Sequence, residues 1–186
     1  MSESNSNNAS LLSQFRQHWE AVGGEYIAIT DIAALPDAII KYLTDNDICA
    51  VVLAGSPLTR DLGASLAGRM EILVDFGREA LSPEAAKERC SRADAGISGV
   101  DALIAATGTL AMASRGQGDR LASTLPPVHI VVATEAPIFA DLGSFLASTP
   151  PDPTYSFITG PSRTADIEKQ LVRGVHGPLR VAVFGY

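Results

Sequence analysis

Metal-binding residues are scarce in this sequence. Its 186 residues include two cysteines, Cys49 and Cys90, and three histidines. Four cysteines are needed to hold an iron–sulfur cluster, and a zinc site would have to be built around isolated histidines. We therefore expect no metal and no cofactor in this chain. The two cysteines also lie in different predicted elements, so no disulfide framework is implied.

Positive charge and long apolar runs are scarce too. The 14 Lys and Arg residues are outnumbered by 21 Asp and Glu residues, which argues against a nucleic-acid partner. The longest apolar run, Ile48 to Ala54, is far shorter than the roughly 20 residues of a membrane-spanning helix. The Ser- and Asn-rich segment 1–10 lacks the pattern of a signal peptide and predicts a disordered tail. We expect a cytoplasmic protein with no membrane span.

Strand and helix patterns alternate from residue 11 onward. The apolar run 48–54 is typical of a strand that is covered on both faces of a parallel sheet. One domain over 11–186 is predicted, with an α/β fold in which helices cover both faces of an open, mostly parallel sheet in three layers. Segment 94–114 fits short strands joined by glycine-centred turns. Strands are predicted over 26–30, 48–54, 71–75, 128–134, 155–159 and 179–184, and helices over 11–22, 32–43, 58–68, from 82, and over 137–148 and 164–173.

The transition from strand to helix at 158–168 predicts an anion site. A helix that starts here would be capped by Ser162 or Thr164 and would point free N–H groups outward, with Arg163 as a fixed positive charge. A carboxylate or phosphate would fit such a site. The alternative is a well-capped helix in which Asp166 and Glu168 only complement the helix dipole.

Two further segments carry polar side chains. Thr107 and Thr109 flank Gly108, which would let the backbone approach a small polar ligand, although a tight structural turn explains this segment more simply. Arg120 and His129 bracket a double proline, and His129 could transfer protons near neutral pH. A hydrogen-bonded structural histidine is the more common case.

Several ordered motifs resemble the LUD domain of the lactate utilization protein C family. They are segments 93–109, 125–129, 159–168 and 174–178. The resemblance implies a fold similar to the NagB/RpiA/CoA-transferase group and a role in oxidising L-lactate to pyruvate with two iron–sulfur partner proteins. Because this chain lacks cluster motifs, it is expected to be the cluster-free component and to contact a small carboxylate substrate.

The resemblance also selects the candidate site residues. Many family members carry an acidic residue just before the Thr-Gly pair, where this chain has Ala105 and Ala106. An independent enzyme or binding module for a phosphorylated, acyl-CoA or folate-like molecule is the main alternative, and a structural adaptor is a third. The catalytic candidates are Asp166, Glu168 and His129, and the substrate- or anion-binding candidates are Thr107, Gly108, Thr109, Arg120, Ser162, Arg163, Thr164 and His176.

Overall fold

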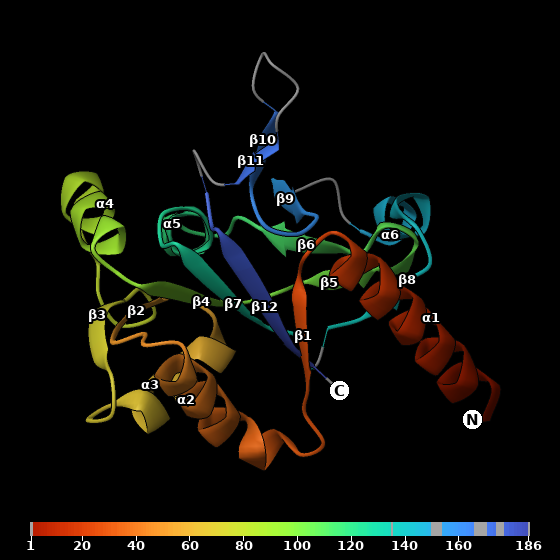
Figure 1. The fold of residues 1–186 in the computed structure, drawn as a ribbon, viewed down its shortest axis with the longest axis horizontal. Coiled ribbons are helices and arrows are strands. Elements are labelled where there is room, and N and C mark those ends of the chain that lie inside the picture. Colours follow the sequence, from red (N-terminus) through yellow and green to blue (C-terminus); the bar gives the residue numbers. More distant parts are fainter. Residues whose placement is uncertain (1, 135, 150–153, 166–170, 174–176, 186) are drawn as a thin grey trace.

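A six-stranded sheet in which every strand pair is parallel forms the centre of the protein (Figure 1). The computed structural model describes residues 2–134, 136–149, 154–165, 171–173 and 177–185. The strand order is β1-β12-β7-β4-β2-β3, and the predicted α/β class is confirmed. The strands are β1 (Glu25–Ala28), β2 (Ala50–Leu53), β3 (Glu71–Asp75), β4 (Ala95–Gly99), β7 (Val128–Val132) and β12 (Arg180–Gly185).

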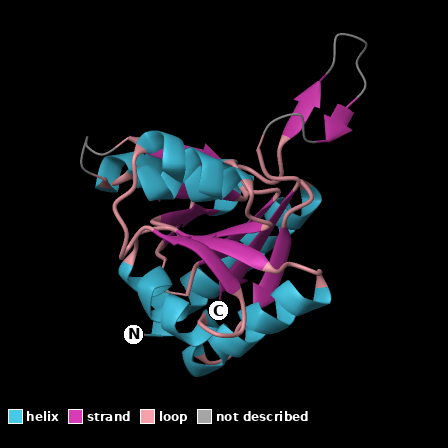
Figure 2. Ribbon diagram, turned by 90° about the vertical axis from the view of Figure 1, so that its left-hand side faces the viewer, coloured by secondary structure: helices cyan, strands magenta, loops and turns pink. Residues whose placement is uncertain are grey.

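Helices cover both faces of this sheet. On one face, α2 (Leu35–Asp45) and α3 (Pro57–Leu66) bury their apolar sides against alternate strand residues such as Leu53 and Ile130. The opposite face is covered by α1 (Ser2–Ala21), α4 (Pro83–Ser91) and α5 (Gln117–Thr124). Figure 2 shows the sheet between these layers. The alternation is the expected one, because successive side chains of a strand point to opposite faces.

A smaller mixed sheet with the order β8-β5-β6-β9 packs beside α1. The predicted short strands of segment 94–114 are confirmed, and Gly108 adopts a left-handed conformation (φ 60°) after the short helix η2 (Ala105–Thr107). Helix α6 (Leu142–Ser148) covers one face of this sheet with Phe145. The strands are β5 (Ala102–Ile104), β6 (Thr109–Ala113), β8 (Ile138–Phe139) and β9 (Tyr155–Ile158).

The start of the chain differs from the predicted disordered tail. Helix α1 begins at Ser2 and not at residue 11. Its second half is fixed by Phe15 and Trp19, which are fully buried. Once a helix is nucleated, each added residue gains one hydrogen bond, so even poor helix formers can extend it toward the N-terminus.

Two other predicted elements need correction, and one helix was missed. The helix expected over 164–173 is wrong, because the described parts form an antiparallel hairpin of β10 (Arg163–Ala165) and β11 (Leu171–Arg173). Its register opposes Thr164 to Val172, two β-branched residues that favour strands. The first part of the helix predicted over 137–148 contains β8, and α5 was not predicted.

Candidate functional site

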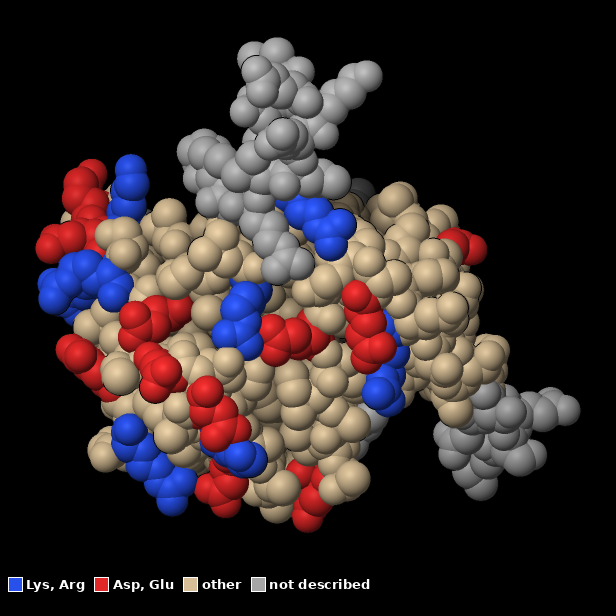
Figure 3. All heavy atoms as spheres, in the orientation of Figure 1, with Lys and Arg blue, Asp and Glu red and all other residues tan. Residues whose placement is uncertain are grey.

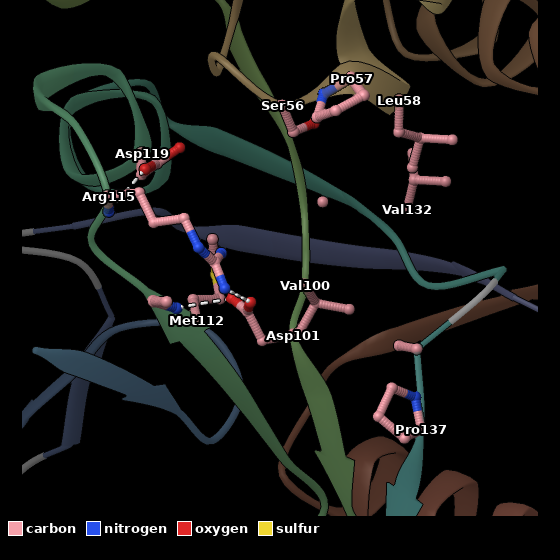
Figure 4. Close-up of a pocket in the computed structure, with 13 residues that line it drawn as sticks. Ser56, Pro57, Leu58, Val100, Asp101, Met112, Arg115, Asp119, Val132 and Pro137 are labelled. Atoms are coloured by element: carbon pink, nitrogen blue, oxygen red, sulfur yellow. Dashed lines mark hydrogen bonds and ion pairs between the residues drawn. The ribbon is translucent and has the colours of Figure 1, made fainter. Parts of the chain in front are cut away.

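The strand order creates a switch point between β2 and β4. The chain leaves β2 toward β3 at the sheet edge, whereas from β4 it continues in the other direction through β7 to β12. In open α/β sheets, ligands bind outside the carboxyl ends of the strands at such a point. A pocket of about 360 Å³ lies there, and we call it the carboxyl-edge pocket. Its walls come from the turn after β2, the end of β4, the end of β6 and the segment after β7 (Figure 4).

The start of α3 forms one wall of this pocket. Ser56 caps the helix: its Oγ accepts from the Thr59 N–H at 3.2 Å, and its own N–H donates to Thr59 Oγ1 at 3.1 Å. Pro57 occupies the first helical position, where no N–H is needed. The positive end of the helix dipole therefore meets the pocket and favours a negatively charged group there.

An ion pair between Arg115 and Asp101 forms the polar side of the pocket. Arg115 Nη2 lies 2.5 Å from Asp101 Oδ1, and the two side chains reach toward each other from different elements (Figure 4). The Ala113 N–H donates to Asp101 Oδ2 at 2.7 Å, which anchors the carboxylate to the end of β6. The hydrogen bond to Asp101 raises the pKa of Arg115, so this guanidinium is always charged.

Asp119 is the third charged group in the lining, and it has a structural task. Its Oδ2 accepts from the N–H groups of Arg115 and Gly116, both at 3.0 Å, and thereby caps the start of α5. Arg115 and Asp119 also line a second cavity of about 320 Å³, on the side of Phe76. The carboxyl-edge pocket thus offers an anchored carboxylate acceptor, a guanidinium donor and a helix start, which together suit a small molecule that has both a negative group and a hydrogen-bond donor.

The hydroxyl-rich turn found in the sequence is internally paired. Thr107 Oγ1 and Thr109 Oγ1 are 2.7 Å apart, and Thr109 Oγ1 lies 2.8 Å from Thr159 Oγ1. Gly108 lies close against α1, because a Cβ added there would be 2.5 Å from the backbone nitrogen of Trp19. The absence of a side chain at Gly108 therefore allows α1 to pack closely, at a position where the sequence predicted a ligand.

The other anion-site candidates lie away from the carboxyl-edge pocket. Ser162 lines a separate groove of about 330 Å³ together with Thr159, beside the end of α5. Arg163 donates to the Val22 carbonyl at the turn after α1, and Arg120 is exposed on α5. The helix start that should have joined them is absent from the described residues. Thr164 lies in β10, whereas three further candidates lie outside the described residues: Asp166, Glu168 and His176.

His129 is fully enclosed in the sheet. Its side chain has no exposed surface, and its Nε2 lies 2.8 Å from Ser98 Oγ. Burial lowers the pKa of His129 to about 3, so the imidazole is neutral near pH 7. This position disfavours the predicted proton transfer to a bound substrate, and it matches the alternative of a structural histidine.

Sequence reasoning missed the residues that line the carboxyl-edge pocket. The sequence did indicate Ser56 and Pro57, because Gly-Ser-Pro ends a strand and starts a helix there. In open α/β sheets, ligands bind at such carboxyl ends of strands. Asp101 and Arg115 gave no comparable signal, since they meet only through the fold. Among the described residues, no group of three or more His, Cys, Asp or Glu could hold a metal ion. In the same part of the chain, no helix combines the length and apolar character needed to cross a membrane.

The fold and the pocket define a doubly wound α/β domain with a pocket at its carboxyl edge. The sequence model of the LUD domain family matches residues 12–184, and the chain belongs to this family.

Similar proteins support this assignment. Lactate utilization protein C of Exiguobacterium sp. is 38% identical over 108 residues, which cover 54% of this chain and 47% of that protein. The protein of the same name from Deinococcus radiodurans is 33% identical over 94% of this chain and 79% of its own length. The crystal structure of a DUF162 family protein from Deinococcus radiodurans is similar over 96% of this chain and 97% of that one, with a TM-score of 0.65 and 28% identity. These relatives support a role in lactate utilization.

Proposed function

We propose that this protein is the cluster-free component of an L-lactate utilization system in the cytoplasm, and that it supports the oxidation of L-lactate to pyruvate. Two iron–sulfur partner proteins would carry the electrons. The names of the relatives support lactate as the substrate. Electron transfer needs a cofactor, and the chain has only two cysteines with which to hold one.

The carboxyl-edge pocket is the observation that carries this proposal. A guanidinium is the side chain best suited to hold a carboxylate, because its planar array of donors can form two parallel hydrogen bonds. Arg115 presents this group at the pocket with 64% of its side chain exposed. The positive end of the helix dipole at the start of α3 would also favour the negative charge of a bound carboxylate.

Reconstitution tests the proposal. Lactate-dependent reduction of an artificial acceptor is measured for the chain alone, the iron–sulfur partners alone and the mixture. We expect activity in the mixture and a loss of at least tenfold with Arg115→Met. The matched control is Arg69→Met, since Arg69 is exposed and pairs with Asp37 away from the pocket. Equal oxidation by the partners with and without this chain would refute a substrate-contacting role.

The size of the site favours a second candidate function. The carboxyl-edge pocket and the adjoining cavity, at about 360 and 320 Å³, are in the range of sites for much larger ligands than lactate. An independent binding module for a phosphorylated, acyl-CoA or folate-like molecule would use this space. Thermal-shift measurements separate the two functions, because stabilisation by phosphorylated ligands and not by lactate supports the second.

A further inference from the structure

Asp101 and Arg115 differ in how firmly they are held. The Asp101 side chain is 22% exposed, and one of its oxygens is fixed by the Ala113 N–H. The Arg115 side chain is 64% exposed and reaches Asp101 from the segment between β6 and α5. The carboxylate is therefore an anchored acceptor, whereas the guanidinium contacts it through Nη2 and has further N–H groups that can donate to a ligand.

We infer that this pair selects 2-hydroxy acids over 2-oxo acids, an inference that rests on the proposed carboxylate site. A carboxylate bound to Arg115 places its neighbouring C2 substituent beside Asp101. A hydroxyl at C2 donates a hydrogen bond to the Asp101 carboxylate. The carbonyl of a 2-oxo acid has no hydrogen to donate, and it brings a second electronegative oxygen against that carboxylate.

The other charged group of the pocket does not compete for this role. Asp119 Oδ2 accepts from the N–H groups of Arg115 and Gly116 at the start of α5, whereas Asp101 is the carboxylate that pairs with the Arg115 guanidinium. Asp101, Arg115 and Asp119 are the charged residues among the pocket's described lining. Asp101 is thus the acceptor that is next to the anion-binding guanidinium. The substrate of a lactate-oxidising system would be held and its 2-oxo product released.

Direct binding to the full chain tests the inference with four small acids. L-Lactate and glycolate carry a C2 hydroxyl, pyruvate carries a carbonyl, and propionate carries neither while matching lactate in size. Affinities are measured by isothermal titration calorimetry or by NMR chemical-shift titration. We expect L-lactate to bind about tenfold more tightly than pyruvate or propionate, the size of effect that one charge-assisted hydrogen bond produces.

Variants locate the source of the preference. Asp101→Asn keeps an oxygen that can accept from the Ala113 N–H but removes the negative charge, so the ratio of lactate to pyruvate affinity should fall to within about twofold of one. Asp45→Asn is the matched control, because Asp45 is exposed and pairs with Lys41 away from the pocket. Far-UV circular dichroism checks that both variants are folded.

The outcomes separate this inference from the proposed function. If all four acids bind the unmodified chain equally, a carboxylate site exists but the selection by hydroxyl is refuted, whatever the variants do. If the preference for lactate persists in folded Asp101→Asn, then Asp101 is not the selecting residue. If none of the acids binds, the proposed site itself is wrong and the inference falls with it.

Discussion

His129 couples the stability of the fold to pH. Its pKa is lowered to about 3 by burial, below its ordinary value of 6.5. Between these two values the unfolded chain binds a proton that the folded chain does not, so the free energy of unfolding falls as pH decreases from 6.5 toward 3. We expect the unmodified protein to lose about 2 kcal/mol from this group between pH 7.5 and pH 5, measured by urea denaturation.

A variant without the imidazole isolates this effect. His129→Gln should be less stable at pH 7.5, because it leaves Ser98 with a poorer partner and a partly empty site. Its stability should nevertheless fall less steeply with acid than that of the unmodified protein. Identical slopes for the two proteins would show that His129 is protonated in the folded state at pH 5.

Thr134, like Nδ1 of His129, contributes a buried polar atom without a hydrogen-bond partner among the residues that the structure describes. Thr134 is 7% exposed, and its Oγ1 makes no hydrogen bond to any part of the chain that the structure describes. Thr134→Val keeps the shape and removes this unsatisfied group, so we expect the free energy of unfolding to rise by about 1 kcal/mol. In the control Thr109→Val, the hydroxyl lost is bonded to Thr107 and Thr159, and stability should fall. Destabilisation by Thr134→Val would mean that the hydroxyl has a partner in solution.

At the scale of elements, Gly108 determines how closely α1 packs against the smaller sheet. An added Cβ would lie 2.5 Å from the Trp19 nitrogen, and the φ of 60° disfavours any side chain. Gly108→Ala should cost about 2 kcal/mol or more and alter Trp19 fluorescence. Gly116→Ala is the control, since its Cβ meets nothing within 4 Å and the change from glycine to alanine at the N-cap of α5 should cost no more than about 1 kcal/mol. Equal stabilities of the two variants would contradict the close packing of α1.

The sequence predicted best those elements whose pattern of apolar residues directly indicates which faces are buried. The run 48–54 contains β2, and the strand predicted over 71–75 is β3, because continuous apolar stretches occur where both faces of a strand are covered. The helix predicted over 164–173 was wrong because good capping residues indicate a helix only if the chain continues as one. Helix α5 was not predicted because glycines surround its start and because it packs through a tertiary contact, in which the Ala122 backbone lies close against Gly96 of β4.

The site was harder to predict than the fold. Ser56 and Pro57 are visible as a strand end that becomes a helix start, so one wall of the carboxyl-edge pocket has a local signature. Asp101 and Arg115 are ordinary surface residues in the sequence. Their pairing depends on how β5 and β6 turn back beside the main sheet, which no local pattern encodes.

For the whole molecule, the packing predicts one cooperative unfolding transition. Trp19, the only tryptophan, lies in the apolar cluster that joins α1, the main sheet and the smaller sheet. Its fluorescence therefore reports on the junction, whereas far-UV circular dichroism reports on all elements. The two probes should give coincident urea curves. Separate midpoints would show that α1 and the smaller sheet unfold independently of the main sheet.

The pairing of β1 with β12 has a consequence for how the chain folds during its synthesis. Residues 25–28 find their hydrogen-bonding partners at 182–185, nearly the full length of the chain away. The ribosome makes β2, β3, β4 and β7 in between, and these strands can associate as soon as they emerge. β1 cannot join this partial sheet until its partner β12 has been synthesised. A chain that stalls in translation before Arg180 would therefore expose an unfinished strand edge to chaperones and proteases.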